Sequence, residues 1–195
     1  RISTGNILYF MFLLNSTQNT YEMKPLDYLD YMLKFSGDKS LLDFLKKRNL
    51  ATKLDSSIYE SYEKFTIYSI SMELTDDGLN QIDNVLKLTF NYINKIKTTK
   101  KEKSIYDEIK KIYDVSFKFQ EKSDDYTGYV STLSTSMFDI DKRYLYQSLL
   151  YWDYMHTEFD AELIDKTMSE IKLENSIVMI GTHKDLSNNL KNQFF

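Results

Sequence analysis

The chain has 195 residues, of which 42% are hydrophobic and 28% charged, and its net charge is -4. This content suffices for a folded core, and it excludes the global positive charge that attracts nucleic acid. Without cysteine, disulfides and thiolate metal sites are excluded, and the redox compartment stays open. The longest apolar run, Ile7–Leu14, is too short to cross a bilayer, and no signal peptide is visible. We therefore expect neither nucleic acid nor a membrane as a partner.

Two helices are predicted to follow a buried first strand. The continuous apolar run Ile7–Leu14 lies between polar residues, a pattern typical of a buried strand. Pro25 favours the first turn of a helix, and apolar residues follow it at helical spacing: Leu26, Leu29, Met32 and Leu33. Ser36 and Gly37 interrupt this pattern. Asp38 is the predicted cap of a second helix, which ends in three basic residues at Lys46–Arg48.

A pair of strands and a sharp corner are predicted next. The segment Phe65–Leu74 alternates between apolar and polar residues, as a half-buried strand does, and Thr52–Ile58 is its candidate antiparallel partner. Thr75 then predicts a helix cap, with Asp76 and Asp77 at the positive end of the helix dipole. The two carboxylates could be read as an acid–base pair, but adjacent residues on a helix do not face each other. Capping is therefore the expected role.

The second half of the chain is predicted to be mainly helical. The lysine run Lys97–Lys103 is expected to be a solvated linker, and Asp160 is expected to cap the last helix. Apolar residues at helical spacing predict five helical segments: Leu79–Ile93, Ile105–Phe119, Asp124–Phe138, Asp141–Tyr151 and Ile164–Ile171. The β-branched run Ser176–Thr182 predicts a last buried strand. This order predicts one α+β domain over residues 1–195, with helices on one face of a mainly antiparallel sheet.

No active-site motif is visible in the chain. His156 has Glu158 and Asp160 nearby, but a metal site needs more convergence, so we expect a surface histidine or one satisfied by its neighbours. His183 follows the last strand and is expected to be exposed. The motifs of serine nucleophiles, dinucleotide sites and phosphate-binding loops are absent. The sequence therefore predicts no catalytic residue and no metal ligand.

A family resemblance lies in phrases that occur in a fixed order. They are GDKSLLDFLKKRNLATKL (Gly37–Leu54), IYSISMELTDDGLNQIDNVLKLTFNYINKIK (Ile67–Lys97), DEIKKIYDVSFKFQEK (Asp107–Lys122), DDYTGYVSTLS (Asp124–Ser134) and IKLENSIVMIGTHK (Ile171–Lys184). By order and spacing, over nearly the whole chain, they resemble the second domain of insulin-degrading-enzyme-type zinc metallopeptidases, the pitrilysin or insulinase family. Each phrase is moderately specific by itself.

The resemblance implies a large endopeptidase of four domains, each an α+β roll of the LuxS/MPP-like kind, closing in two halves around a peptide chamber. In that family the zinc ligands and the catalytic glutamate lie on the first domain, in the motif H-x-x-E-H, which this chain lacks. The chain is thus predicted to be a non-catalytic domain cut from a longer polypeptide, whose other domains are its partners. Zinc would belong to the parent enzyme, and no cofactor to this piece.

The resemblance also implies an exosite, a surface away from the catalytic centre where an extended peptide substrate adds as a further strand. It maps onto Gly37–Ser40 and Thr52–Ser57, which gives as candidate residues Gly37, Lys39, Thr52, Lys53, Leu54, Asp55 and Ser56. Two positions depart from the family pattern. Lys39 replaces the second glycine of G-P-G-S, and Asp55-Ser56-Ser57 replaces a glycine-rich strand end. Both changes add side chains where a peptide backbone would have to approach closely.

Two other functions stay open from the sequence. The same fold could serve as an inactive scaffold or partner subunit, and an altered zinc motif upstream in the parent gene would favour that reading. The chain could also be a stand-alone interaction domain whose resemblance is only architectural. If the first strand and the exposed Tyr and Phe residues are buried against other domains of a parent protein, the isolated chain could dimerise through that surface.

Overall fold

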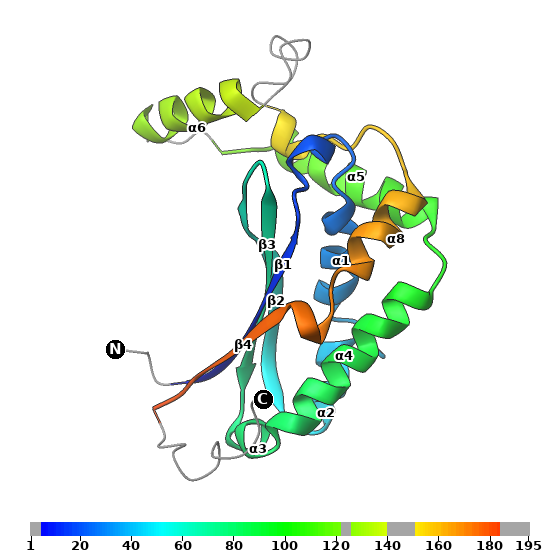
Figure 1. The fold of residues 1–195 in the computed structure, drawn as a ribbon, viewed down its shortest axis with the longest axis vertical. Helices are drawn as coiled ribbons and strands as arrows, with labels where there is room; N and C mark the ends of the chain where they lie inside the picture. Colours follow the sequence, from blue (N-terminus) through cyan, green and yellow to red (C-terminus); the bar gives the residue numbers. More distant parts are fainter. Residues whose placement is uncertain (1–4, 122–125, 140–150, 184–195) are drawn as a thin grey trace.

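The computed structural model describes residues 5–121, 126–139 and 151–183. Its four described strands form one antiparallel sheet in the order β2-β3-β1-β4: β1 (Asn6–Asn15), β2 (Ala51–Ser61), β3 (Phe65–Leu74) and β4 (Ser176–Gly181). The helices are α1 (Pro25–Lys34), α2 (Leu41–Lys47), α3 (Asp76–Asn80), α4 (Ile82–Thr98), α5 (Lys103–Lys118), α6 (Tyr126–Asp139) and α8 (Ala161–Ser169). Short 3-10 helices are η1 (Gln18–Thr20), η2 (Trp152–Tyr154) and η3 (Leu173–Asn175). Figure 1 shows α1, α2, α4, α5 and α8 on one face of the sheet, so the predicted α+β fold is confirmed.

Alternation along the two central strands builds the core. Side chains at every second position of β1 and β3 are buried toward the helices: Leu8, Phe10, Phe12, Tyr68, Ile70 and Met72. Phe90 of α4 packs edge-on against Phe10 and Phe12, with ring centroids 5.8 and 6.2 Å apart. The intervening residues face the other side of the sheet, which these helices leave open (Figure 1).

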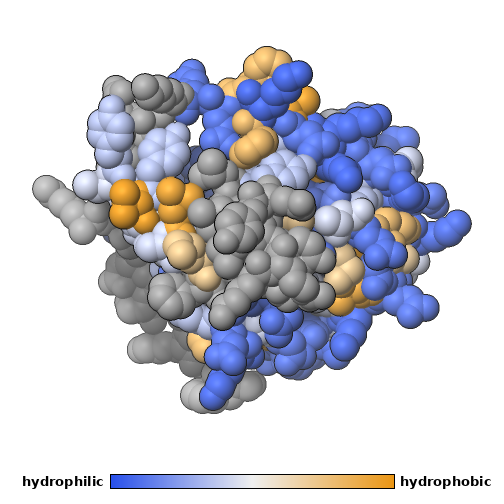
Figure 2. Space-filling model, turned by 90° about the horizontal axis from the view of Figure 1, so that it is seen from above, coloured by the Kyte–Doolittle hydropathy of each residue, from blue (hydrophilic) through white to orange (hydrophobic). Residues whose placement is uncertain are grey.

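The open face of the sheet and the α6 end of the molecule differ in character. Large apolar side chains of β1 and β4 are exposed on the open face: Tyr9, Leu13, Ile177 and Met179. Seen from the α6 end, the described surface is mostly hydrophilic, with hydrophobic residues in small separate groups (Figure 2). None of the helices described is long and apolar enough to cross a membrane.

Two predicted helix starts need correction. The cap of α2 is Ser40, not Asp38, because the Ser40 Oγ accepts the Asp43 N–H at 3.0 Å. Asp38 instead pairs with Lys47 at 3.0 Å. The single helix predicted after the corner is two, α3 and α4, because Gln81 adopts φ −115° and ψ 38° and breaks the first.

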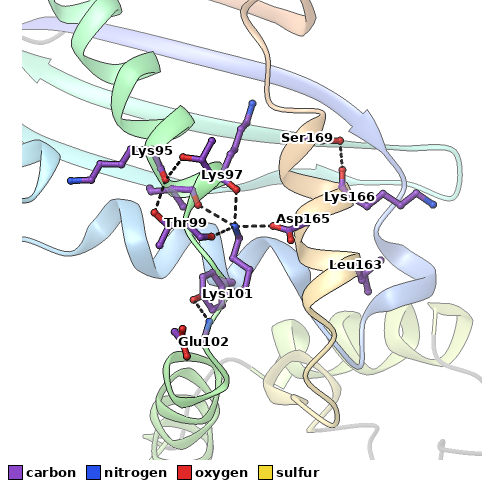
Figure 3. Close-up of polar contacts among 12 residues, drawn as sticks. Lys95, Lys97, Thr99, Lys101, Glu102, Leu163, Asp165, Lys166 and Ser169 are labelled. Carbon is purple, nitrogen blue, oxygen red and sulfur yellow. Dashed lines mark hydrogen bonds and ion pairs between the residues drawn. The ribbon is translucent and has the colours of Figure 1, made fainter.

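The lysine run is not a solvated linker. The Lys101 side chain is only 1% exposed, and its Nζ donates to the carbonyls of Ile96, Lys97 and Thr99 at 3.1, 3.0 and 2.8 Å. The same ammonium pairs with Asp165 of α8 at 2.8 Å (Figure 3). The linker prediction was wrong because the last carbonyls of α4 lack partners within the helix and recruit this cation instead.

The remaining helical predictions meet different outcomes. The segment Asp124–Phe138 contains α6, which begins at Tyr126 in the part of the chain that the structure describes. The predicted helix Asp141–Tyr151 lies outside the described residues, apart from Tyr151 itself. Asp160 caps α8 as predicted, and its Oδ1 accepts the Leu163 N–H at 2.9 Å.

Candidate functional site

The predicted exosite strand lies at the edge of the sheet. Strand β2 pairs with β3 on one side, and the described residues place no strand on the other. Such an edge presents a row of backbone N–H and C=O groups to solvent or to an added strand. The candidate segment Thr52–Ser57 lies in this edge, as the resemblance implies.

Helix α1 holds β2 in place from beneath. The Ser56 hydroxyl donates to Oδ1 of Asp30 at 2.6 Å, and the Tyr68 hydroxyl of β3 donates to the same oxygen at 3.2 Å. Burial raises the pKa of Asp30, although Lys34, paired with it at 2.8 Å, and Ser56 act in the opposite direction. The Leu54 side chain is also buried. Two of the predicted residues, Leu54 and Ser56, thus fasten the strand to the helix layer.

Asp55 lies along the outer edge of β2. Its carboxylate lies 3.4 Å from Lys34 Nζ, and its Oδ1 accepts the backbone N–H of Ser56 at 2.9 Å. Successive side chains of a strand point to opposite faces, so Asp55 starts on the face opposite Ser56 and reaches Lys34 of the helix layer around the edge. The carboxylate therefore already binds one N–H group of the edge strand. The sequence indicated that Asp55 adds a side chain where the family has glycine, but it did not indicate the hydrogen bond from the Ser56 N–H to this carboxylate.

The turn before α2 is connected to the edge of β2 by the end of α1. That helix ends at Lys34, the residue that contacts Asp55, and the turn Gly37–Ser40 follows within a few residues. Lys39 has φ 65°, in the left-handed region that favours glycine, and the family pattern has glycine at this place. Its N–H donates to Asp43 at 3.0 Å. The Lys39 side chain is exposed, like those of Thr52 and Lys53 on the strand.

Two cavities flank α1, and sequence reasoning missed both. The first, about 280 Å³, lies at the far end of β2 and is lined in part by Ile58, Ser61 and Trp152. The second, about 320 Å³, is lined by residues of α1 and α5, including Lys34 and Tyr113. Their walls come from elements far apart in the sequence, so no local pattern could have indicated them.

The histidines are not arranged as metal ligands. His156 is buried, with Nε2 3.0 Å from Asp27 Oδ2 and Nδ1 3.2 Å from the Tyr154 carbonyl, so it is satisfied by its neighbours as expected. His183 is exposed, as predicted. Within residues 5–121, 126–139 and 151–183, no three His, Asp or Glu side chains lie together so that they could hold a metal ion. The residues described therefore do not fit a zinc site.

Comparison with protein families gives two matches. The family described as the peptidase M16 inactive domain matches residues 2–142, and the middle or third domain of peptidase M16 matches residues 117–195. The second match contains β4, which pairs with β1 of the first match in the same sheet.

Relatives and solved structures agree with these matches. Human nardilysin is 28% identical over 183 residues, 91% of this chain and 16% of nardilysin, and human insulin-degrading enzyme is 27% identical over 163 residues, 84% and 16%. The chain thus spans about one sixth of the length of these relatives. Pitrilysin superposes with a TM-score of 0.81 at 20% identity, over 90% of this chain and 18% of its own. An inactive peptidase domain from Bordetella parapertussis gives 0.69 at 11%, over 95% and 94%. At these identities the structures show the fold.

Proposed function

Since the chain belongs to the peptidase M16 family and matches its inactive domain, we propose that it is the peptide-holding, non-catalytic domain of an insulinase-like zinc metalloendopeptidase. The family resemblance read from the sequence is confirmed by these matches. Zinc and the catalytic residues would belong to another domain of the parent polypeptide, since the residues described here do not fit a metal site. We propose this parent enzyme and its activity, and we propose that residues 1–195 form one domain of it.

The edge of β2 is the observation that carries the proposal. An extended peptide can add to an exposed edge strand through backbone hydrogen bonds, which bind many sequences because they read little of the side chains. Strand β2 is 11 residues long, whereas β4 at the opposite edge has six. The longer edge offers more backbone groups, so it is the better platform for a substrate.

The open face of the sheet supports a role in a peptide chamber. Monomeric soluble proteins rarely leave large contiguous apolar patches exposed, and this face exposes Tyr9, Leu13, Ile177 and Met179. We propose that this face is one wall of a chamber that other domains of the same polypeptide close. In their absence, the isolated chain would dimerise through it.

Removing the Asp55 carboxylate tests the exosite. In Asp55→Ala the Ser56 N–H loses its internal acceptor and becomes available to a peptide carbonyl. One additional hydrogen bond is worth about 1 kcal/mol, so we expect roughly fivefold tighter binding of a labelled extended peptide. The affinity is measured by fluorescence anisotropy on the 195-residue chain.

Glu63→Ala is the matched control for charge. It removes the same charge from an exposed position in the turn between β2 and β3, outside the edge strand, and is expected to leave the affinity unchanged. An Asp55→Ala chain that binds the peptide no better than wild type would contradict the proposed use of this edge.

A second function, as an inactive scaffold of the same family, is favoured by two observations. The edge N–H of Ser56 is already bound, and Lys39 places a side chain in the adjoining turn. If wild type binds no peptide and Asp55→Ala does, the edge has been closed in this protein and the scaffold is the better account.

A further inference from the structure

The cavity at the far end of β2, hereafter the Trp152 pocket, lies next to the proposed peptide edge. We propose that it receives one large, uncharged side chain, aromatic by preference, of a peptide added to β2. The inference rests on the proposed function, because it assigns the pocket to the same peptide. Residues lining the pocket come from β2, from η1 and its flanking residues, from the start of α1 and from η2, among them Ile58, Ser61, Tyr21, Leu26, Trp152 and Asp153.

Strand geometry connects the pocket to the edge. Ile58 is opposite Tyr68 of β3, whose side chain is buried toward the helices, so Ile58 lies on the helix face of β2 together with Ser56. A shift of register between Ile58 and Glu60 then interrupts the ladder. A peptide beside β2 would send every second side chain to this same face, over α1. The side chain next to Ile58 would therefore reach the pocket.

The walls of the pocket suit an aromatic ring. The rings of Trp152 and Tyr21 stand edge-to-face with centroids 6.4 Å apart, and Pro25, Leu26 and Ile58 add apolar side chains to a lining that also contains polar residues. Aromatic side chains prefer such edge-to-face and offset contacts. The volume, about 280 Å³, is just below the range of about 300–1,000 Å³ that whole small-molecule ligands need. One large side chain is the better fit.

The charges around the pocket disfavour a charged occupant. Lys24 Nζ lies 5.6 Å from the Trp152 ring centroid, and two carboxylates, Asp27 and Asp153, also line the pocket. Burial lowers the pKa of Lys24 and raises that of Asp153, so both charges are already poorly solvated. A carboxylate, an ammonium or a guanidinium would lose its hydration in this pocket, and each would lie near at least one like charge, the two aspartates or Lys24. An uncharged aromatic ring is repelled neither by Lys24 nor by the two aspartates.

The backbone at Lys24 is consistent with a binding role. Lys24 immediately precedes α1 with φ 44° and ψ 63°, a left-handed conformation that is unfavourable for a non-glycine residue. Strain of this kind gathers at ligand sites, where the surrounding structure maintains it. Here it accompanies an ammonium held over the indole ring in the wall of the pocket.

Trp152 makes the pocket directly observable, because it is the only tryptophan of the chain. Tryptophan-free, labelled peptides that differ at one position, Phe, Ala, Glu or Lys, are titrated into the 195-residue chain. Anisotropy of the label reports binding to the edge, and Trp152 emission reports the pocket. We expect the Phe peptide to bind about tenfold tighter than the Ala peptide and to change the emission. The Glu and Lys peptides should bind no tighter than the Ala peptide.

Two variants separate the pocket from the edge. Trp152→Ala should remove the preference for Phe over Ala in the anisotropy titration, and Trp152→Phe should largely restore it. Equal affinities for the Phe and Ala peptides with unchanged Trp152 emission would overturn the pocket and leave the exosite standing. If no peptide binds to the wild type or to Asp55→Ala, the proposed function fails and the pocket assignment fails with it.

Discussion

Replacing Gly78 by alanine is expected to destabilise the chain by roughly 3 kcal/mol or more. A Cβ built at Gly78 would overlap the carbonyl oxygen of Leu50 and lie 2.8 Å from its carbonyl carbon. That carbonyl also accepts the Thr75 N–H at 3.1 Å, so it cannot move aside without loss of the bond that ties the corner to the start of β2. An ordinary helical glycine-to-alanine change would instead stabilise by about 1 kcal/mol. A loss of stability would therefore indicate the close approach to Leu50, whereas a gain would indicate an ordinary helical glycine.

The other glycines provide matched controls for Gly78. A Cβ at Gly5 meets nothing within 4 Å, so Gly5→Ala should change the free energy of unfolding by no more than about 0.5 kcal/mol. At Gly37 the Cβ would meet only the ring of Phe35, an exposed side chain that can rotate away. Denaturant titration of the three variants measures the order. A Gly78→Ala chain as stable as Gly5→Ala would refute the close approach at this corner.

Lys101→Met is expected to cost roughly 3 kcal/mol of stability. Methionine keeps much of the length of the side chain but removes all its donors, so the carbonyls of Ile96, Lys97 and Thr99 lose a shared partner in a nearly buried place. Asp165 of α8 loses its ion-pair partner as well. The substitution thus loosens both the end of α4 and the contact between two helices (Figure 3).

Two further variants separate the loss of a positive charge and the loss of the ion pair from the loss of the buried hydrogen-bond donors. Lys100→Met removes the same charge from the exposed neighbouring position and should be nearly neutral in thermal unfolding. Asp165→Asn removes only the ion pair, whose carboxylate is 57% exposed, and should cost less than about 1 kcal/mol. If Lys101→Met unfolds at the same temperature as Lys100→Met, the buried cation does not support the fold as described.

Local patterns sufficed for the elements whose residues interact with near neighbours in the chain. Alternation identified the buried face of β3, and Thr75 was recognised as a cap because its hydroxyl accepts the Gly78 N–H, a donor within one turn. The edge position of β2 came from the resemblance, and the observed strand order agrees with it.

Features that depend on distant residues could not be predicted. Gly78 is required because of the Leu50 carbonyl, and the Lys101 ammonium pairs with Asp165, which α8 brings beside it. A lysine-rich run carries no sign that one of its cations is enclosed. At the site, the Trp152 pocket depends on how η1, η2 and the start of α1 lie beside β2.

Amide hydrogen exchange with and without an extended peptide tests the central claim most directly. If peptides add to the β2 edge, exchange should slow at outward-facing amides within Ala51–Ser61 and stay unchanged in β4, the opposite edge. Asp55→Ala should enlarge the protection at Ser56. Protection confined to β4, or binding of the peptide with no protection in β2, would contradict the account.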